Sequence, residues 1–208
     1  MTLPNGITDL MLAASRGDLA RVETLLAAGV ETLDAQDAFG QTALSYAASA
    51  GHAHIIAALV MAGADVTLRN RAGFTGLEIA SAKGHTAAAQ MLRQAHLCAA
   101  ARDGDLALLA QMLDGGADIN AQLADGWTAL MIAAYHDQPA AVRALLSHGA
   151  DAALQTDTGR TARSIALGLS HQECYRLLTN NATRALSSDE PPTSDDVTDF
   201  ADAAHPEN

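Results

Sequence analysis

Residues 40–48 read Gly-Gln-Thr-Ala-Leu-Ser-Tyr-Ala-Ala, and residues 126–134 repeat the pattern as Gly-Trp-Thr-Ala-Leu-Met-Ile-Ala-Ala. Looser copies begin at Gly73 and Gly159, each 33 residues after the start of the copy before it. The Thr suits a helix N-cap, because its hydroxyl accepts a hydrogen bond from an unpaired backbone N–H. The Leu and Ala that follow recur at helical spacing. A fixed period of this length indicates a repeat protein.

A second motif closes each unit with an apolar pair followed by Gly, as in Leu59-Val-Met-Ala-Gly-Ala-Asp and Leu145-Leu-Ser-His-Gly-Ala-Asp. Between the two motifs, a glycine such as Gly51 stands where one helix must end and the chain must reverse, a position that suits positive φ. The residues between a closing Gly and the next Thr are polar and too few for another helix. Each unit therefore predicts a helix, a turn, a second helix and a projecting hairpin.

Helix, turn, helix and hairpin at a period of 33 residues resembles the ankyrin repeat, and the resemblance covers about residues 5–180. It implies an all-α repeat solenoid of about six units. We place them at about 5–38, 39–71, 72–94, 96–123, 124–156 and 157–180. The chain lacks the Pro and the His of the family's Thr-Pro-Leu-His signature, from which we expect less stable repeats.

The fourth unit departs from the period. Gly84 and Gly104 are only 20 residues apart, which predicts that the hairpin between the third and fourth repeats is missing. A larger offset replaces it, since Gly40 and Thr42 recur 86 residues later at Gly126 and Thr128. We therefore expect a duplicated three-repeat block, with repeats 1–3 in residues 1–94 and repeats 4–6 in 95–180, and a bend or altered stacking at the seam. Drift of one degenerate repeat is the alternative.

Residues 181–208 are rich in Asp, Ser, Thr and Pro. Such a segment buries too little apolar surface to offset the entropy of ordering, so we expect a disordered acidic tail. The whole chain has a formal net charge of −12 and no basic stripe, which argues against nucleic acid and against an anionic membrane surface as partners. Neither a signal peptide nor an apolar span is visible, so we expect a cytoplasmic protein. One Lys against eleven Arg suggests a bacterial source.

The sequence offers no catalytic constellation. His52 and His54 form a His-x-His pair at the start of a second helix, where a capping or solvated role outweighs metal ligation. Cys98 and Cys174 share no short motif, and we expect both to be buried fillers. No glycine-rich loop has phosphate-binding spacing. We therefore expect no enzyme, no cofactor and no metal.

Repeat arrays present an extended concave face to partners. In ankyrin proteins this face comprises the hairpin tips and the exposed ends of the first helices, and the resemblance maps it here by phase. The candidate partner-binding residues are Arg16, Phe39, Gln41, Arg71, Phe74, Lys83, Arg102, Asp103, Asp125, Trp127, Tyr135, His136 and Arg160.

Much of the small aromatic stock falls on these positions, and aromatics dominate binding hot spots. Phe74 and Trp127 hold equivalent phases beside the missing hairpin, so one groove between them is expected. The alternative is that each aromatic folds down onto its neighbouring hairpin. The expected function is binding of one soluble protein partner, as an adaptor, inhibitor or protective partner, by a chain that is monomeric when unbound. The alternative is a secreted bacterial effector that engages a host protein.

Overall fold

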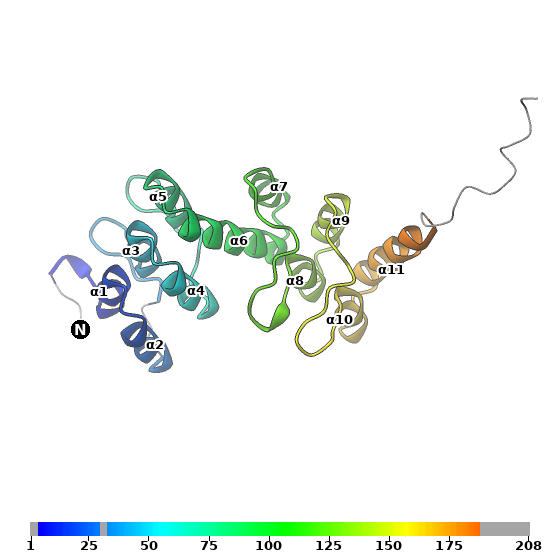
Figure 1. The fold of residues 1–208 in the computed structure, drawn as a ribbon, viewed down its shortest axis with the longest axis horizontal. Helices are drawn as coiled ribbons and strands as arrows, with labels where there is room; N and C mark the ends of the chain where they lie inside the picture. The colour runs from blue at the N-terminus through cyan, green and yellow to red at the C-terminus, as the bar shows by residue number, and fades with distance from the viewer. Residues whose placement is uncertain (1–3, 30–32, 188–208) are drawn as a thin grey trace, which may run out of the picture.

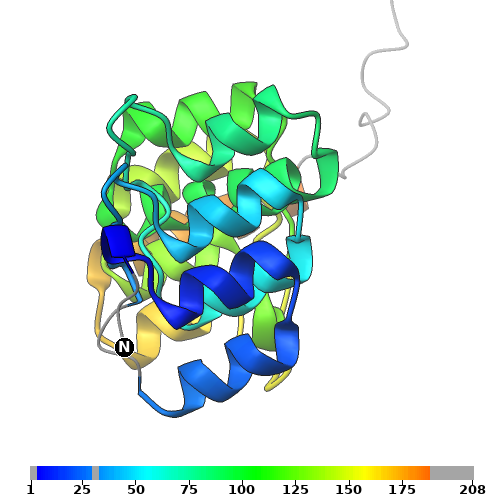
Figure 2. The ribbon, with the colours of Figure 1, turned by 90° about the vertical axis from the view of Figure 1, so that its left-hand side faces the viewer.

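The computed structural model describes residues 4–29 and 33–187. Antiparallel helix pairs follow one another along an elongated molecule (Figure 1), and Figure 2 shows the first pairs stacked with their axes nearly parallel. In the described ranges the helices are α1 (Asp9–Arg16), α2 (Leu19–Ala27), α3 (Ala43–Ala50), α4 (Ala53–Met61), α5 (Gly76–Ala82), α6 (Thr86–Asp103), α7 (Leu106–Asp114), α8 (Ala129–Tyr135), α9 (Pro139–Ser147), α10 (Ala162–Gly168) and α11 (Gln172–Ser187), with 3-10 turns η1 (Pro4–Gly6) and η2 (Ala124–Gly126). The expected all-α repeat solenoid is confirmed.

Threonine caps start the first helices, as the repeated motif predicts. In each case the hydroxyl accepts a hydrogen bond from the backbone N–H three residues later, at 3.2 to 3.4 Å. The capping residues are Thr8 for α1, Thr42 for α3, Thr75 for α5, Thr128 for α8 and Thr161 for α10. Gly51 ends α3 in the left-handed conformation, with φ of 78°, which an L side chain rarely adopts.

Neighbouring hairpins are joined by a glutamine bridge that recurs in both halves. Gln36 Nε2 donates to the Gly40 and Arg69 carbonyls, each at 3.0 Å. Gln122 Nε2, 86 residues later, donates to the Gly126 carbonyl at 3.0 Å and to the Gln155 carbonyl at 2.9 Å. The same hydrogen bonds at the same offset support the proposed duplication of a three-repeat block.

No hairpin interrupts residues 86–103, because α6 runs through them as one helix. The offset of 87 residues between Gly17 and Gly104 maps the cap Thr8 onto Ala95. There the chain reads Arg93-Gln94-Ala95, three good helix formers, where the other units carry Gly-x-Thr. With no cap and no turn residue the helix continues. Thus α6 serves as the second helix of the third repeat and the first helix of the fourth.

The hydrophobic core divides at the middle of α6. One buried cluster runs from Leu10 to Ala95 and the other from Leu97 to Leu178. Residues 94–98 are all buried, since the centre of α6 is covered on every side. We call residues 4–95 and 96–187 the first and second block.

The shared helix reverses the faces of the two blocks. α6 packs on α4 and α5 at one end and on α7 and α8 at the other. As a result the second-helix side of the first block, formed by α4 and the start of α6, faces the hairpin and first-helix side of the second block (Figure 1). The repeat phase therefore maps one face only within a block, and the extended concave face expected from it does not continue across the seam, where a bend or altered stacking was expected.

The last helix continues beyond the boundary expected at residue 180. α11 extends to Ser187, so residues 181–187 belong to a helix and not to the tail. Ala182, Arg184 and Leu186 are good helix formers, and extending an existing helix needs no new nucleation. The rest of the expected tail, residues 188–208, lies outside the described residues.

His96 is a buried titratable group at the seam. Its side chain is 4% exposed, and its Nδ1 lies 2.8 Å from the Leu92 carbonyl oxygen. Burial lowers the pKa of His96; the Leu92 hydrogen bond and the charges of Glu78 and Asp65 oppose that shift, while Arg69 adds to it. The folded protein therefore keeps this ring neutral at a pH where the unfolded chain, with a His pKa of about 6.5, takes up a proton.

Because the unfolded state binds the extra proton, the free energy of unfolding should fall as pH drops from about 7 to about 5.5. Urea unfolding at the two pH values measures this loss, and His96→Gln should lose less stability between them than the wild type. The control is His148→Gln, since His148 makes the same 2.8 Å contact with a carbonyl four residues back but is exposed. Equal losses in His96→Gln and wild type would contradict the assignment.

Candidate functional site

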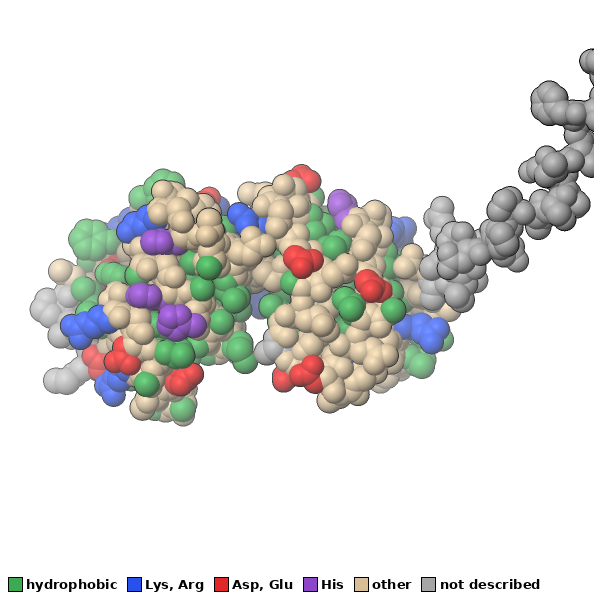
Figure 3. Space-filling view, in the orientation of Figure 1, with side chains coloured by type: hydrophobic (Ala, Val, Ile, Leu, Met, Phe, Trp, Pro, Cys, Tyr) green, Lys and Arg blue, Asp and Glu red, His purple; other side chains and the backbone are tan. Residues whose placement is uncertain are grey.

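A cleft of about 1050 Å³ lies where the two blocks face each other. Figure 3 shows the hollow between them. We call it the interblock cleft. Its first wall is the second-helix side of the first block, and its second wall is the hairpin before α8 together with α8 itself. The lining residues are Ala57, Val60, Met61, Ala87, Gln90, Met91 and Gln94 on the first wall, and Asp118, Ala121, Gln122, Leu123, Asp125, Trp127, Ile132, Tyr135 and His136 on the second.

Apolar side chains form most of the surface of the cleft. Met61, at the end of α4, is 70% exposed, and Met91 and Val60 are half-buried beside it. Leu123 and Ile132 face them from the second block. Methionine is unbranched and polarisable, so a wall that carries two of them adapts to different apolar groups.

Three rings stand on the second wall. Trp127 and Tyr135 meet edge to face, with centroids 5.6 Å apart and planes at 84°. The rings of Tyr135 and His136 are 5.0 Å apart at 71°. Edge-to-face contact is a preferred geometry for aromatic pairs, so the rings hold one another in place. Tyr135 remains 45% exposed, and the group offers a rigid aromatic edge to the cleft.

The rim of the cleft is acidic. Asp118 and Asp125 line the main cleft, and Asp65 lines an adjoining hollow of about 430 Å³. All three are exposed, and none has a salt bridge to another described residue. Arg102 also lines the hollow, but its Nε and Nη2 donate to the Asp103 carboxylate at 2.8 and 2.9 Å. These hydrogen bonds hold the pKa of Asp103 below its usual value, and the Asp103 carboxylate balances the positive charge of the guanidinium.

The hairpin at the cleft breaks the pattern of the other hairpins. Three residues before the turn glycine, two of them carry Asp37 and Asn70, whose side-chain oxygens accept backbone N–H groups of the turn at 2.8 to 3.0 Å. The equivalent residue here is Leu123, which has no acceptor. Its side chain lines the cleft instead. This hairpin therefore exchanges local hydrogen bonds for apolar surface, and such local exceptions concentrate at functional sites.

In the first hairpin, the Asp37 carboxylate makes hydrogen bonds that Leu123 cannot make at the equivalent position. Its second carboxylate oxygen accepts the Tyr46 hydroxyl at 2.8 Å. Burial would raise the pKa of Asp37, but the hydrogen bonds from Gln41, Tyr46 and Phe39 keep it below the usual value. Burial and the neighbouring carboxylate raise the pKa of Tyr46 to about 12. The first hairpin is thus held by a buried polar network that the hairpin at the cleft lacks.

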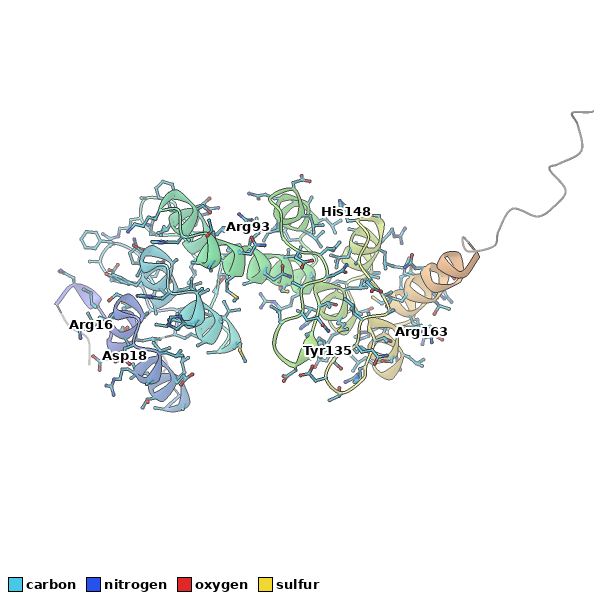
Figure 4. All side chains as sticks on the ribbon, viewed as in Figure 1. Arg16, Asp18, Arg93, Tyr135, His148 and Arg163 are labelled. Carbon is cyan, nitrogen blue, oxygen red and sulfur yellow. The ribbon has the colours of Figure 1, made fainter. Side chains whose placement is uncertain are left out.

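The structure brings some predicted partner-binding residues together and separates the rest. Asp125, Trp127, Tyr135 and His136 line the interblock cleft, and Arg102 lines the adjoining hollow beside Asp103. Arg160 lies exposed on the next hairpin of the second block. The others lie on the first block: Arg16, Phe39, Gln41, Arg71, Phe74 and Lys83. Figure 4 places Arg16 near one end of the molecule and Tyr135 on the second block.

The expected groove between Phe74 and Trp127 is wrong. Trp127 lines the cleft, whereas Phe74 is not among its lining residues. The two residues hold the same phase in their repeats, but continuous α6 turns the hairpins of the first block away from those of the second. Phe74 and Phe39, 52% and 65% exposed, therefore sit on a separate surface.

The two cysteines are buried, and two of the histidines contact backbone carbonyls of the preceding repeat. Burial raises the pKa of both Cys98 and Cys174 to about 12, which disfavours the nucleophilic thiolate. His85 and His171 contact the carbonyls of Ser49 and Ala134 in the preceding repeat, at 3.2 and 2.9 Å. Within residues 4–29 and 33–187, no group of three or more His, Cys, Asp or Glu is placed to hold a metal ion, and no helix is long and apolar enough to cross a membrane.

Comparison with known proteins places the chain among repeat proteins. A family model of ankyrin repeats, in three copies, matches residues 10–99 and again residues 96–189. The two matches meet inside α6.

Among similar proteins, the putative ankyrin repeat protein YahD of Escherichia coli (strain K12) is 27% identical over 198 residues, covering 86% of this chain and 98% of YahD. An L-asparaginase of Dirofilaria immitis is 34% identical over 155 residues, covering 68% of this chain. The human SH3 and multiple ankyrin repeat domains protein 2 is 29% identical over 190 residues, covering 85% of this chain. The chain spans only 26% and 10% of the latter two proteins.

Proposed function

The chain belongs to the ankyrin-repeat family, and from that premise we propose that it is a non-catalytic module that binds a soluble protein partner in the interblock cleft. Ankyrin repeats generally mediate protein–protein interaction. The asparaginase activity in one relative's name is not part of the proposal, because the chain spans about a quarter of that protein and the repeat family accounts for residues 10–189.

The single observation that carries the proposal is the aromatic and methionine lining of an open cleft. Tyr135 and Met61 belong to neither core, and Trp127, which packs against the edge of the second core, also lines the cleft; the three gather on its facing walls. Aromatic anchors bury a large area with few rotatable bonds, which is why they dominate binding energy. Exposed apolar groups gathered in one hollow are typical of an interaction site.

The exposed aromatics of the first block are a weaker candidate for the binding site than the cleft. Phe39 and Phe74 lie on hairpins of the first block, and they do not line either hollow. An apolar residue outside a hollow loses less water on binding than one between two walls. The face of the first block remains the competing location and serves as the internal control.

The test is capture of a partner with the tagged full chain, identification of that partner, and measurement of its dissociation constant for matched variants. Trp127→Ala and Tyr135→Ala should each weaken binding about 30-fold, as expected when a hot-spot residue is truncated. Phe39→Ala, which removes an exposed aromatic ring from the first block, should change the dissociation constant less than about threefold. The opposite order would move the site to the first block. Circular dichroism checks that each variant is folded.

A further inference from the structure

We propose that the occupant of the interblock cleft is a short cationic peptide segment, with apolar side chains against Met61, Met91 and Trp127 and Lys or Arg side chains beside Asp118 and Asp125. This inference rests on the proposed function and specifies the chemistry of the partner. The segment is the part of the partner that enters the cleft.

The size of the cleft favours a segment over a whole domain face. Its volume of about 1050 Å³ lies just above the roughly 300–1,000 Å³ that holds a compact ligand. A few side chains fill such a space, whereas two folded surfaces meet over flatter and larger areas. The aliphatic side chains of the first wall lie opposite the aromatic edge, so apolar side chains of the segment can pack between two walls.

The charges select a cationic segment. The main cleft contains two carboxylates and neither Lys nor Arg among its lining residues. In the adjoining hollow Arg102 is already neutralised by Asp103, while Asp65 is exposed and without a salt bridge to another described residue. Rim charges of one sign attract the opposite sign during encounter and reject the same sign. The chain's net charge of −12 acts in the same direction at longer range.

The same charges disfavour two other occupants. Residues 188–208 of the chain contain seven Asp and Glu and neither Lys nor Arg, so the acidic rim repels them. A second copy of the chain also carries −12. Both remain outcomes of the test below, because deletion of residues 188–208 and sedimentation of the protein alone detect them.

The chain carries its own probe of the cleft, because Trp127 is its single tryptophan. Random 12-residue peptides displayed on phage are selected on the full chain, and the enriched sequences are synthesised without Trp. Titration followed by Trp127 emission then gives a dissociation constant. We expect enrichment of Lys and Arg next to aliphatic residues, a change in Trp127 emission on binding, and weaker binding as salt rises.

Matched double variants test the charges. Asp118→Asn with Asp125→Asn keeps the shape of both side chains and should weaken the selected peptide about 5- to 10-fold at low salt, as expected for two exposed ion pairs. Asp9→Asn with Asp18→Asn removes the same charge at the far end of the molecule and preserves the α2 N-cap, because Asn caps as well as Asp. This pair should change binding less than twofold.

Several results would overturn the proposal. They are enrichment of acidic or uncharged peptides, no enrichment, equal effects of the two double variants, tighter binding on deletion of residues 188–208, or a dimer that closes the cleft. Uncharged peptides that still change Trp127 emission would reject the cationic occupant and leave the proposed function standing. Cationic peptides that bind without changing Trp127 emission, and equally well to Trp127→Ala, would reject the cleft as the site in both proposals.

Discussion

Leu92→Ala and Leu97→Ala should each lower the free energy of unfolding by about 2–5 kcal/mol, the range for truncating a buried leucine. Both side chains are fully buried on α6, five residues apart. They serve different cores, however, because Leu92 packs in the cluster of the first block and Leu97 in that of the second. The pair therefore asks whether the two cores unfold together.

We expect a single transition. Unfolding of the first core removes the packing of the first half of α6, and the remaining half loses the helical turn that precedes it. Each variant should then shift the urea midpoint by the same amount whether followed by far-ultraviolet circular dichroism, which reports the whole chain, or by Trp127 emission, which reports the second block. Gln90→Ala, on the exposed face of the same helix, should change the free energy of unfolding by less than about 0.5 kcal/mol. A lower dichroism midpoint for Leu92→Ala with unshifted Trp127 emission would show that the blocks unfold independently.

The repeat signals in the sequence predicted much of this architecture for local reasons. Thr42 and Gly51 specify where a helix starts and ends through one hydrogen bond and one backbone angle, and both are determined within a few residues. The short interval between Gly84 and Gly104 likewise predicted the missing hairpin. The spacing could not predict how the second block is oriented relative to the first, because this orientation depends on how the centre of α6 packs on both sides.

The candidate site was only half predicted for the same reason. Trp127 and Tyr135 were identified because their hairpin and first-helix phases face partners within a block. Met61 and Met91 were missed, because second helices are expected to point away from a partner. Two departures from the repeat pattern could have pointed to the cleft, one on its first wall and one on its second. Met61 stands where the other units carry Ala27, Asp114 and Ser147, and Leu123 stands where they carry Asp37, Asn70 and Thr156.

Ala95→Pro tests the seam itself and should be the most damaging single change in the chain. A proline inside a helix removes a backbone hydrogen bond and clashes with the carbonyl four residues back, at a cost of about 3 kcal/mol or more. Ala95 is 4% exposed in the middle of α6, so the neighbours leave little room for the kink. Ala95→Ser keeps the backbone hydrogen bond and nearly the same volume, and it should cost about 1 kcal/mol or less.

The change should reach the cleft even in molecules that stay folded. One wall comes from α4 and from α6 up to Gln94, and the other comes from residues 118–136, so every path between the walls along the chain crosses residue 95. A kink there moves the walls apart, and small-angle X-ray scattering should give a larger radius of gyration than for Ala95→Ser. Binding of the selected peptide should fall at least about tenfold, as for the loss of a hot-spot contact. An unchanged radius with undiminished binding would mean that contacts between the walls, and not the continuous helix, set the geometry of the cleft.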